Sequence, residues 1–369
     1  MHRPYGEQLA AKQSRVVLAL RDALGGAAPP VEPVTAAGRQ TGYRVQVKHV
    51  VARTRHGLTI GLYRPGTHHV ADATGCPLHD PLITRALPYL RDALVHSNVP
   101  IHGATRPGIR YALLRASIHE RRILVTLVSS LRKLVEGEAI ARVLRGALPL
   151  AGLLVNTNAT TGNVIVGAQT QRVWGAAELC DRYGDVELSA SPVAFVQANT
   201  RMAARIYAAI ADAAALGGEE RVVDLYCGVG GIALTLAARA REVVAIETEP
   251  AAIRAARTNA QRNRRRNVRF EVGRVEEYGA ALAALRPDVV TLNPPRKGCG
   301  PAVATALADA GVPRILYLSC DPTSFARDAA ALVRGGYRLE RVRPFDLMPH
   351  TEHVELLGEF RRPEAIAAI

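Results

Sequence analysis

Apolar and polar residues follow two different patterns along this chain, and the change falls near residue 186. In residues 7–25, apolar side chains recur at helical spacing and stop at Gly25 and Gly26, which predicts one N-terminal helix. Between residues 42 and 185, short segments alternate apolar with basic or polar residues and are separated by Gly and Pro, which is typical of strands. The clearest predicted strands are 43–50, 58–63, 123–128 and 163–166, and helical patches lie near 81–95 and 130–146.

After residue 186 the pattern predicts helices and strands in turn. Because strands that alternate with helices form βαβ units, this half predicts a doubly wound parallel sheet. We therefore expect an N-terminal helix and linker (1–41), an α+β module (42–185) and a Rossmann-like α/β domain (186–369). The predicted helices here are 200–215, 231–239, 250–263, 301–310 and 323–334, and the predicted strands are 221–225, 242–247, 268–272, 288–292, 314–319, 338–345 and 354–360.

A surplus of positive charge points to the kind of partner. The chain has 47 Lys and Arg against 33 Asp and Glu, a net charge of +14, and only four of the cations are Lys. Guanidinium groups bind phosphate bidentately and stack on bases, so the composition favours RNA as the partner. A GC-rich genome would also favour Arg over Lys, but codon usage does not explain the surplus over acids. We expect an Arg-rich face of the 42–185 module to contact RNA, with an ordinary solvated sheet face as the alternative.

The cysteines and the apolar runs bear on where the protein works. Five cysteines are scattered without a C-x-x-C pair, which argues against a zinc site and a disulfide framework. No apolar run approaches 18 residues, and the first residues lack the apolar segment of a signal peptide. We therefore expect a cytoplasmic monomer that has no membrane contact and keeps its thiols reduced.

A glycine-rich loop follows the first predicted strand of the C-terminal domain. Gly228, Gly230 and Gly231 would let the backbone approach a ligand closely. Asp224 precedes the loop, and an acid there suits the ammonium and sulfonium of S-adenosylmethionine better than a pyrophosphate. Glu247, at the end of the next strand, is placed to hold two ribose hydroxyls. The glycine spacing also fits a dinucleotide-binding fold, which stays open as the alternative.

The strand predicted at 288–292 runs into Asn293, Pro294 and Pro295. The prolines stiffen the loop, so the Asn293 side chain and nearby carbonyls are expected to point into a site. Asn-Pro-Pro followed by an aromatic residue is a signature of amino-group methyltransferases. Here Arg296 follows, which weakens the N-methylation interpretation and favours contact of this loop with phosphate.

A cysteine and a glutamate complete the candidate chemistry. Cys320 lies at the carboxyl end of a predicted strand, where doubly wound enzymes place their sites, and the next helix start is expected to lower its pKa. Glu355 follows in a polar stretch with His350 and His353. A thiolate that attacks C6 of uracil makes C5 nucleophilic, and a base must later remove the C5 proton. We predict Cys320 as nucleophile and Glu355 as base, against a small buried thiol and a surface carboxylate as structural alternatives.

Five motifs and Glu247 make the sequence resemble the bacterial RNA uridine-C5 methyltransferases that modify 23S rRNA and tRNA. The resemblance implies a class I methyltransferase fold, with Cys320 as nucleophile and Glu355 as the proton-abstracting base. The Asn-Pro-Pro-Arg motif and the histidine spacing are more like the 23S rRNA branch. The implied S-adenosylmethionine contacts are Gln197, Tyr226, Glu247 and Asn293. The motifs are FVQAN (195–199), DLYCGVGG (224–231), NPPRKG (293–298), SCDP (319–322) and PHTEHVE (349–355).

Two differences from that family affect the cofactor and the target. Many members carry four N-terminal cysteines that ligate an iron–sulfur cluster, whereas only Cys76 matches one of them here. One thiol cannot hold a cubane cluster, so we expect no iron–sulfur cluster. The sequence also lacks the oligonucleotide-binding barrel of some members, which leaves the target open. Since the sequence begins about where the missing cysteines would end, a longer natural N-terminus is an alternative.

The predicted function is S-adenosylmethionine-dependent methylation of uridine C5 in RNA, with 23S rRNA favoured and the target base flipped out of a loop. Four alternatives stay open. The first is the same reaction on tRNA, and the second is methylation of an exocyclic base amine, which would not need Cys320. The others are a nicotinamide-dependent oxidoreductase and a non-catalytic RNA-binding protein.

Overall fold

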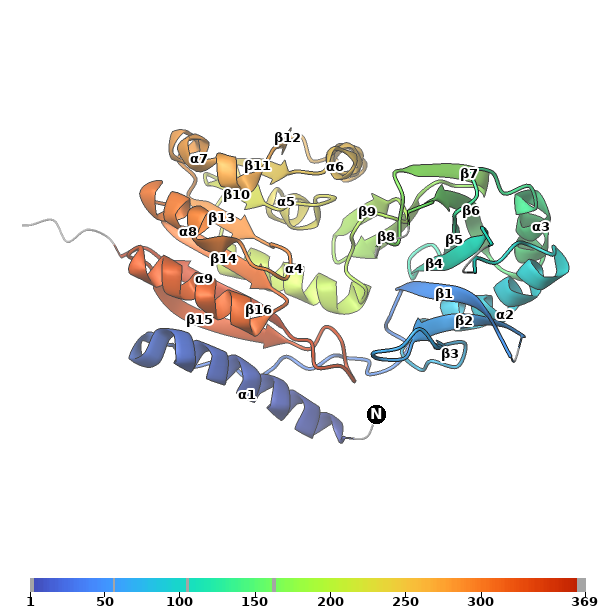
Figure 1. Ribbon diagram of the computed structural model, residues 1–369. Coiled ribbons are helices and arrows are strands. Elements are labelled where there is room, and N and C mark those ends of the chain that lie inside the picture. Colours follow the sequence, from blue (N-terminus) through green and yellow to red (C-terminus); the bar gives the residue numbers. More distant parts are fainter. Residues whose placement is uncertain (1–2, 56, 104–105, 161–163, 364–369) are drawn as a thin grey trace, which may run out of the picture. The chain divides into compact units, whose positions relative to one another are not determined.

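The computed structural model describes residues 3–55, 57–103, 106–160 and 164–363. The chain divides into two compact units (Figure 1). The large unit contains Met1–Gln40, Tyr183–Leu188 and Arg201–Ile369, and the small unit contains Thr41–Arg182 and Ser189–Thr200. The N-terminal helix therefore packs with the C-terminal half of the chain.

A seven-stranded sheet with the order β12-β11-β10-β13-β14-β16-β15 forms the centre of the large unit. The strands β12, β11, β10, β13 and β14 are parallel, and β16 and β15 continue the sheet antiparallel. The bounds are β10 (Arg221–Leu225), β11 (Glu242–Glu247), β12 (Val268–Val272), β13 (Val289–Leu292), β14 (Arg314–Ser319), β15 (Arg338–Phe345) and β16 (Glu355–Arg361).

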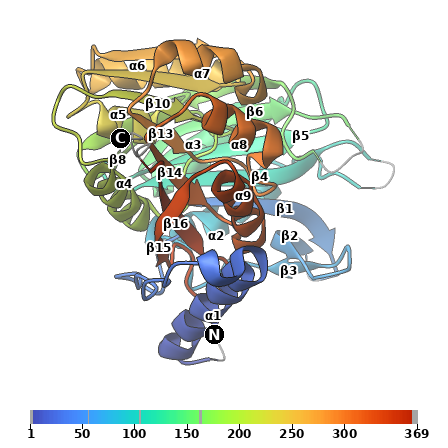
Figure 2. The same ribbon diagram turned by 90° about the vertical axis from the view of Figure 1, so that its left-hand side faces the viewer.

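Helices cover both faces of this sheet. Apolar side chains of α1, α7, α8 and α9 form one core with the strands, and α1 lies beside α9 (Figures 1 and 2). The helices α4, α5 and α6 lie on the opposite face (Figure 1). The bounds are α1 (Tyr5–Leu24), α4 (Thr200–Ala214), α5 (Gly231–Leu236), α6 (Pro250–Arg262), α7 (Gly279–Leu285), α8 (Gly300–Asp309) and α9 (Pro322–Arg334). Among the described residues, none of the helices combines the length and apolar character needed to span a bilayer.

The predicted α/β class and doubly wound sheet are confirmed. The strand and helix bounds expected after residue 200 agree with the structure to within one or two residues, except that α5 ends at Leu236 instead of 239. Beyond α5, the Ala237 and Ala240 carbonyls accept hydrogen bonds from the Asn267 side chain, which takes the place of further helical partners. The α-helix therefore stops at this point.

The small unit is built on a second seven-stranded sheet, with the order β3-β2-β1-β4-β5-β6-β7. All pairs are antiparallel except β5 and β6, which are parallel because α3 connects them as a crossover. The helices α2 and α3 bury their apolar sides on one face. The bounds are β1 (Gln46–Thr54), β2 (Gly57–Tyr63), β3 (Val70–Asp72), β4 (Ile109–Ser117), β5 (Arg122–Ser129), β6 (Leu150–Thr157), β7 (Gln169–Gly175), α2 (Pro81–His96) and α3 (Gly137–Ala147).

Two predictions in this part of the chain were wrong. The described residues 164–166 form no strand, and position 163 lies outside the described residues. The reason lies in Asn158, whose side chain donates to the carbonyls of Val164 (2.6 Å) and Ile165 (3.1 Å), the acceptors that a strand partner would need. The helix expected from residue 130 begins at Gly137. A separate hairpin of β8 (Leu179–Tyr183) and β9 (Val186–Ala190) contributes residues to both units.

Candidate active site

The register of two neighbouring strands brings Cys320 and Glu355 together. β14 and β16 pair antiparallel, and the last pair is Ser319 with Leu356. One further step in the same register sets Cys320 opposite Glu355. Side chains directly opposite each other share a face of the sheet, with their Cβ atoms about 5 Å apart. The two candidate catalytic residues therefore interact although 35 positions separate them in the sequence.

Glu355 is a buried carboxyl group. Its side chain is 6% exposed, and burial raises its pKa to about 8, although the charge of Arg296 acts in the opposite direction. A carboxyl group whose pKa lies near the working pH is suited to accept a proton and release it again. The alternative of an ordinary surface carboxylate is therefore wrong.

Cys320 is half-buried, directly after β14 and before α9. Burial and the nearby Glu355 raise the pKa of its thiol, while the charge and a hydrogen bond of Arg296 lower it. The prediction that the start of α9 lowers this pKa was wrong in its net direction. Asp321 caps that helix, accepting from the backbone N–H groups of Thr323 (3.0 Å) and Ser324 (2.9 Å), so a carboxylate already balances the positive helix end.

The charge of Arg296 acts on both residues of this pair, whereas the sequence predicts that its loop contacts phosphate. Its Nη2 atom lies 2.7 Å from Nδ1 of His353. Burial and the charge of Arg296 lower the pKa of His353, so the ring stays neutral and can accept this hydrogen bond. Arg296 also lowers the pKa values of Cys320 and Glu355. It therefore favours the thiolate and the carboxylate, the two forms that the predicted chemistry uses.

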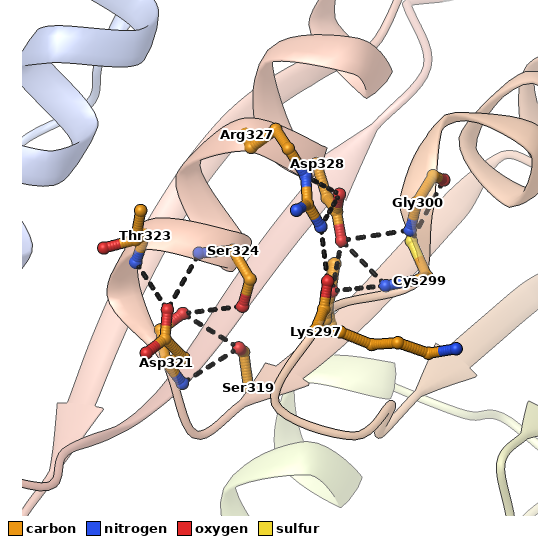
Figure 3. Close-up of polar contacts among 10 residues, drawn as sticks. Lys297, Cys299, Gly300, Ser319, Asp321, Thr323, Ser324, Arg327 and Asp328 are labelled. Carbon is orange, nitrogen blue, oxygen red and sulfur yellow. Dashed lines mark hydrogen bonds and ion pairs between the residues drawn. The ribbon is translucent and has the colours of Figure 1, made fainter.

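The loop that carries Arg296 is braced from α9 (Figure 3). The buried Asp328 accepts from the Cys299 backbone N–H (2.8 Å) and from the Tyr317 hydroxyl (2.8 Å), and Arg327 donates to the Lys297 carbonyl (2.6 Å). Side-chain bonds from a rigid helix hold a loop more firmly than the loop's own backbone would. One helix thus supports the loop after β13 and, through its first turn, the segment after Cys320.

Asp224 holds the two ends of the glycine loop through hydrogen bonds. Its carboxylate is fully buried and accepts from the Thr291 hydroxyl (2.6 Å) and from the Ala233 backbone N–H (3.0 Å) in α5. Burial raises its pKa to about 7; these two hydrogen bonds oppose that shift, and the charge of Glu247 adds to it. The structure shows Asp224 joining β10, β13 and the start of α5, and its contact with a cofactor stays a prediction.

The loop itself needs glycine at two positions. Gly230 caps α5 with φ of 94°, a conformation that L side chains rarely adopt. At Gly231, a Cβ atom would lie 2.6 Å from the hydroxyl oxygen of Tyr207 in α4, so only glycine allows that approach. Tyr226, half-buried at the start of the loop, also has positive φ (61°). The turn after β10 therefore depends on left-handed backbone conformations and on the missing side chain at Gly231.

Glu247 and Asn293 lie beside this loop at strand ends. Glu247 accepts from the backbone N–H of Gly228 (3.1 Å) and from that of Glu249 (3.1 Å). The backbone N–H of Asn293 donates to the Leu225 carbonyl (3.3 Å), which holds the end of β13 against the end of β10. The structure thus gathers these predicted cofactor residues at the carboxyl ends of adjacent parallel strands, where open α/β sheets bind ligands.

Gln197 belongs to the small unit, in the segment Ser189–Thr200, and is buried. Its contact with a cofactor stays a prediction. The described residues include no cluster of three or more His, Cys, Asp or Glu side chains arranged to bind a metal ion. The expected lack of an iron–sulfur cluster also stays a prediction.

Comparison with known proteins identifies the family of this chain. A family model described as tRNA (Uracil-5-)-methyltransferase matches residues 179–359, which include both candidate catalytic residues. An uncharacterised RNA methyltransferase of Thermosynechococcus vestitus is 35% identical over 96% of this chain and 79% of that protein. The chain belongs to the S-adenosylmethionine-dependent RNA uracil-C5 methyltransferase family. The predicted family and enzyme class are thereby confirmed.

Other members of this methyltransferase family extend the comparison. An uncharacterised RNA methyltransferase of Geobacter sulfurreducens is 39% identical over 86% of this chain, which spans 65% of that protein. The solved structure of Pyrococcus abyssi tRNA (uracil-54, C5)-methyltransferase in complex with S-adenosyl-L-homocysteine is similar with a TM-score of 0.81 and 26% identity. That similarity covers 97% of this chain and 84% of that one. Both 23S rRNA and tRNA stay open as targets of this methyltransferase.

The position of Arg296 in this methyltransferase leads to a prediction that needs no RNA. Replacing Arg296 with Ala removes the charge and the hydrogen bond that lower the pKa of Cys320. We expect alkylation of Cys320 by iodoacetamide at pH 8 to slow by about three- to tenfold, since only the thiolate reacts. Peptide-level mass spectrometry measures this rate. The matched control is Lys297→Ala, which removes the neighbouring cation and should leave the rate unchanged; equal slowing in both variants would contradict a specific contact.

Proposed function

We propose that this chain methylates C5 of a uridine in 23S rRNA through a covalent bond between Cys320 and C6 of the base. The observation that carries the proposal is the pairing of a thiol and a buried carboxyl group across β14 and β16, with Arg296 beside both. An exocyclic amine needs no nucleophile on the enzyme, so this pair favours C5 methylation over N-methylation. We propose that the enzyme works in the cytoplasm as a monomer.

The reaction assigns one task to each residue. The Cys320 thiolate adds to C6 of the uracil, and the electron pair of the C5–C6 double bond moves into an enolate. Bound S-adenosylmethionine supplies the methyl group that C5 takes up. Glu355, as the carboxylate, then accepts the C5 proton, and the C5–C6 double bond re-forms as the Cys320 thiolate leaves. Arg296 stabilises both anionic forms between these steps.

The proposed cofactor site uses the residues at the strand ends. The half-buried Glu247 lies next to the glycine loop, where a carboxylate can hold two ribose hydroxyls. The left-handed turn at Tyr226 and Gly230 allows a ligand to approach the backbone. The positively charged sulfonium and ammonium groups of S-adenosylmethionine suit this loop, because the carboxyl groups of Asp224 and Glu247 lie next to it. The remaining proposed contacts are Gln197, Asp224, Gly228, Gly231 and Asn293.

We assign RNA binding to the small unit as well. Its β1–β2 hairpin exposes Arg53 and Arg55, and Arg64 is exposed just after β2. Exposed guanidinium groups at the ends of strands suit phosphate contacts that position an RNA without reading its sequence. The choice of 23S rRNA over tRNA rests on the Asn-Pro-Pro-Arg motif and the spacing of His350 and His353.

One experiment tests the proposal and chooses the RNA. The purified protein is incubated with S-adenosylmethionine and, separately, with unmodified 23S rRNA and tRNA transcripts, and methylated nucleosides are quantified by mass spectrometry after digestion. We expect 5-methyluridine in the 23S rRNA digest. 5-Methyluridine in the tRNA digest alone would show that tRNA, and not 23S rRNA, is the substrate. A different methylated nucleoside, or none, would overturn C5 methylation.

The buried Glu355 predicts a dependence of folding stability on pH. Its pKa is raised from 4.5 to about 8, so the folded chain keeps this proton where the unfolded chain has released it. The free energy of unfolding therefore falls as pH rises from 4.5 to 8. Replacing Glu355 with Gln removes that loss. We expect the free energy of unfolding of the variant to exceed that of the native protein by roughly 3–5 kcal/mol at pH 9 and by about 1 kcal/mol or less at pH 5, measured by chemical denaturation. An equal difference at both pH values would contradict the raised pKa.

A further inference from the structure

The segment that leads into Glu355 is held by helix α1, more than 330 residues away in sequence. Lys12 donates to Asp346 and to the Met348 carbonyl, and Arg15 donates to the Glu352 carbonyl. All of these acceptors lie in the stretch 346–352, between β15 and β16. Because this stretch has no regular secondary structure, its conformation depends on such side-chain bonds.

The ion pair of Lys12 and Asp346 anchors the start of the stretch. Its side chains are 2% and 0% exposed, and the Tyr5 hydroxyl donates to the other Asp346 oxygen at 2.7 Å. A buried pair with further hydrogen bonds fixes geometry, since removal of either partner leaves an uncompensated charge. Asp346 therefore ties the end of β15 to α1.

Gln8 holds the middle of the same stretch with two hydrogen bonds. Its Oε1 atom accepts from the His350 backbone N–H at 2.9 Å, and its Nε2 atom lies 3.1 Å from Nδ1 of His350. His350 has φ of 62°, a left-handed conformation that is unfavourable for residues other than glycine. Such a conformation persists only where the surroundings hold it. The two hydrogen bonds from Gln8 help to stabilise this conformation of His350.

A short chain of contacts continues from His350 to the catalytic pair. The Thr351 hydroxyl donates to the Met348 carbonyl at 2.8 Å and accepts from the His353 backbone N–H at 3.3 Å. The His353 ring then accepts from Arg296, the cation beside Cys320 and Glu355. A shift of His350 would therefore displace His353, its bond to Arg296 and the first residue of β16.

We propose that α1 is a positioning element for the proton-transfer step and that Gln8 is a positioning residue for Glu355. This inference rests on the proposed function, because it gives the position of Glu355 a catalytic purpose. Gln8 touches neither substrate nor cofactor in this account. It acts by holding the backbone of His350, and a displacement of about 1 Å at a reacting group can cost on the order of 100-fold in rate.

The test compares two identical substitutions on α1. Gln8→Ala removes both bonds to His350, whereas Gln13→Ala removes one bond from the same helix to the Val31 carbonyl (3.0 Å), outside the stretch 346–352. We expect Gln8→Ala to lower kcat by roughly 10- to 100-fold, with the KM values for RNA and S-adenosylmethionine unchanged. The methylated covalent adduct should accumulate, because proton removal becomes slow. Gln13→Ala should behave as the native protein.

A second measurement on the full chain needs no RNA. Hydrogen exchange of the peptide spanning 346–355 should speed up in Gln8→Ala, at His350 above all, and stay unchanged in Gln13→Ala. Unchanged exchange in Gln8→Ala, or faster exchange with normal turnover, would overturn the positioning role while the proposed function stands. A fall in kcat without adduct would overturn it as well. A native protein that forms no 5-methyluridine would instead refute the proposed function.

Discussion

Replacing Cys320 with Ala should abolish methyl transfer. Without the thiol, no bond forms at C6, and C5 of uracil is too weak a nucleophile to take the methyl group. We expect the single-turnover rate of methyl transfer to fall on the order of 10,000-fold or more. Binding of S-adenosylmethionine, measured by calorimetry, should stay within about twofold, because the proposed cofactor residues lie on other strand ends.

The matched control for this variant is Cys180→Ala in β8. Cys180 is buried and its thiol donates to the Asp181 carbonyl, so this variant makes the same substitution away from the candidate site. We expect its methyl transfer to stay near the native rate. Near-normal methylation by Cys320→Ala would exclude the covalent mechanism and leave an exocyclic amine as the target. Equal loss in both variants would indicate a folding defect.

The sequence predicts the elements that carry this site better than it predicts their arrangement. The bounds of β14 and β16 follow from apolar patterns, and both agree with the structure. Their pairing does not follow, because β16 enters the sheet between β14 and β15 and runs against β14. Strand order depends on packing of the whole sheet, which local periodicity does not report. The residues Cys320 and Glu355 could therefore be named from the sequence, whereas their alignment across the sheet could not.

In the small unit, the alternation of apolar and polar residues does not identify every strand. β6 (Leu150–Thr157) is almost uniformly buried, and a short run of apolar residues reads equally as a strand or as a buried helix segment. β4 is likewise buried along most of its length. Strands such as β1 and β2, which keep exposed positions, were predicted near their observed places. β5 is also buried along most of its length, yet the strand predicted at 123–128 matches it. Burial on both faces therefore makes the pattern ambiguous and does not rule out a strand prediction.

The electrostatics of the site depend on contacts that no motif displays. A helix start after Cys320 was expected to favour the thiolate, but Asp321 caps that helix and burial outweighs the remaining effect. The hydrogen bond between Gln8 of α1 and the His350 backbone joins residues that are 342 positions apart. Each of these effects arises from side chains that meet only in the folded chain. The motifs name the reacting groups, and the packing around them sets their pKa values and positions.

Replacing Glu355 with Gln should separate methyl transfer from product release. Gln has the same shape as the protonated carboxyl group but accepts no proton at its amide nitrogen, so the first two steps proceed and the C5 proton stays in place. We expect about one methyl group transferred per enzyme and then arrest, with multiple turnover lowered roughly 100- to 10,000-fold. The protein–RNA adduct, carrying the labelled methyl group, should survive on a denaturing gel.

The control for this trap is Glu359→Gln, the same substitution on the same face of β16. Glu359 contacts Arg343 at 3.4 Å and lies away from Cys320 in the β14–β16 register, opposite Leu316. It should turn over without a stable adduct. Loss of activity in Glu355→Gln without any adduct would make the carboxyl group necessary before methyl transfer. The base would then have to be sought elsewhere, and the raised pKa of Glu355 would describe a buried acid that stays protonated through the reaction.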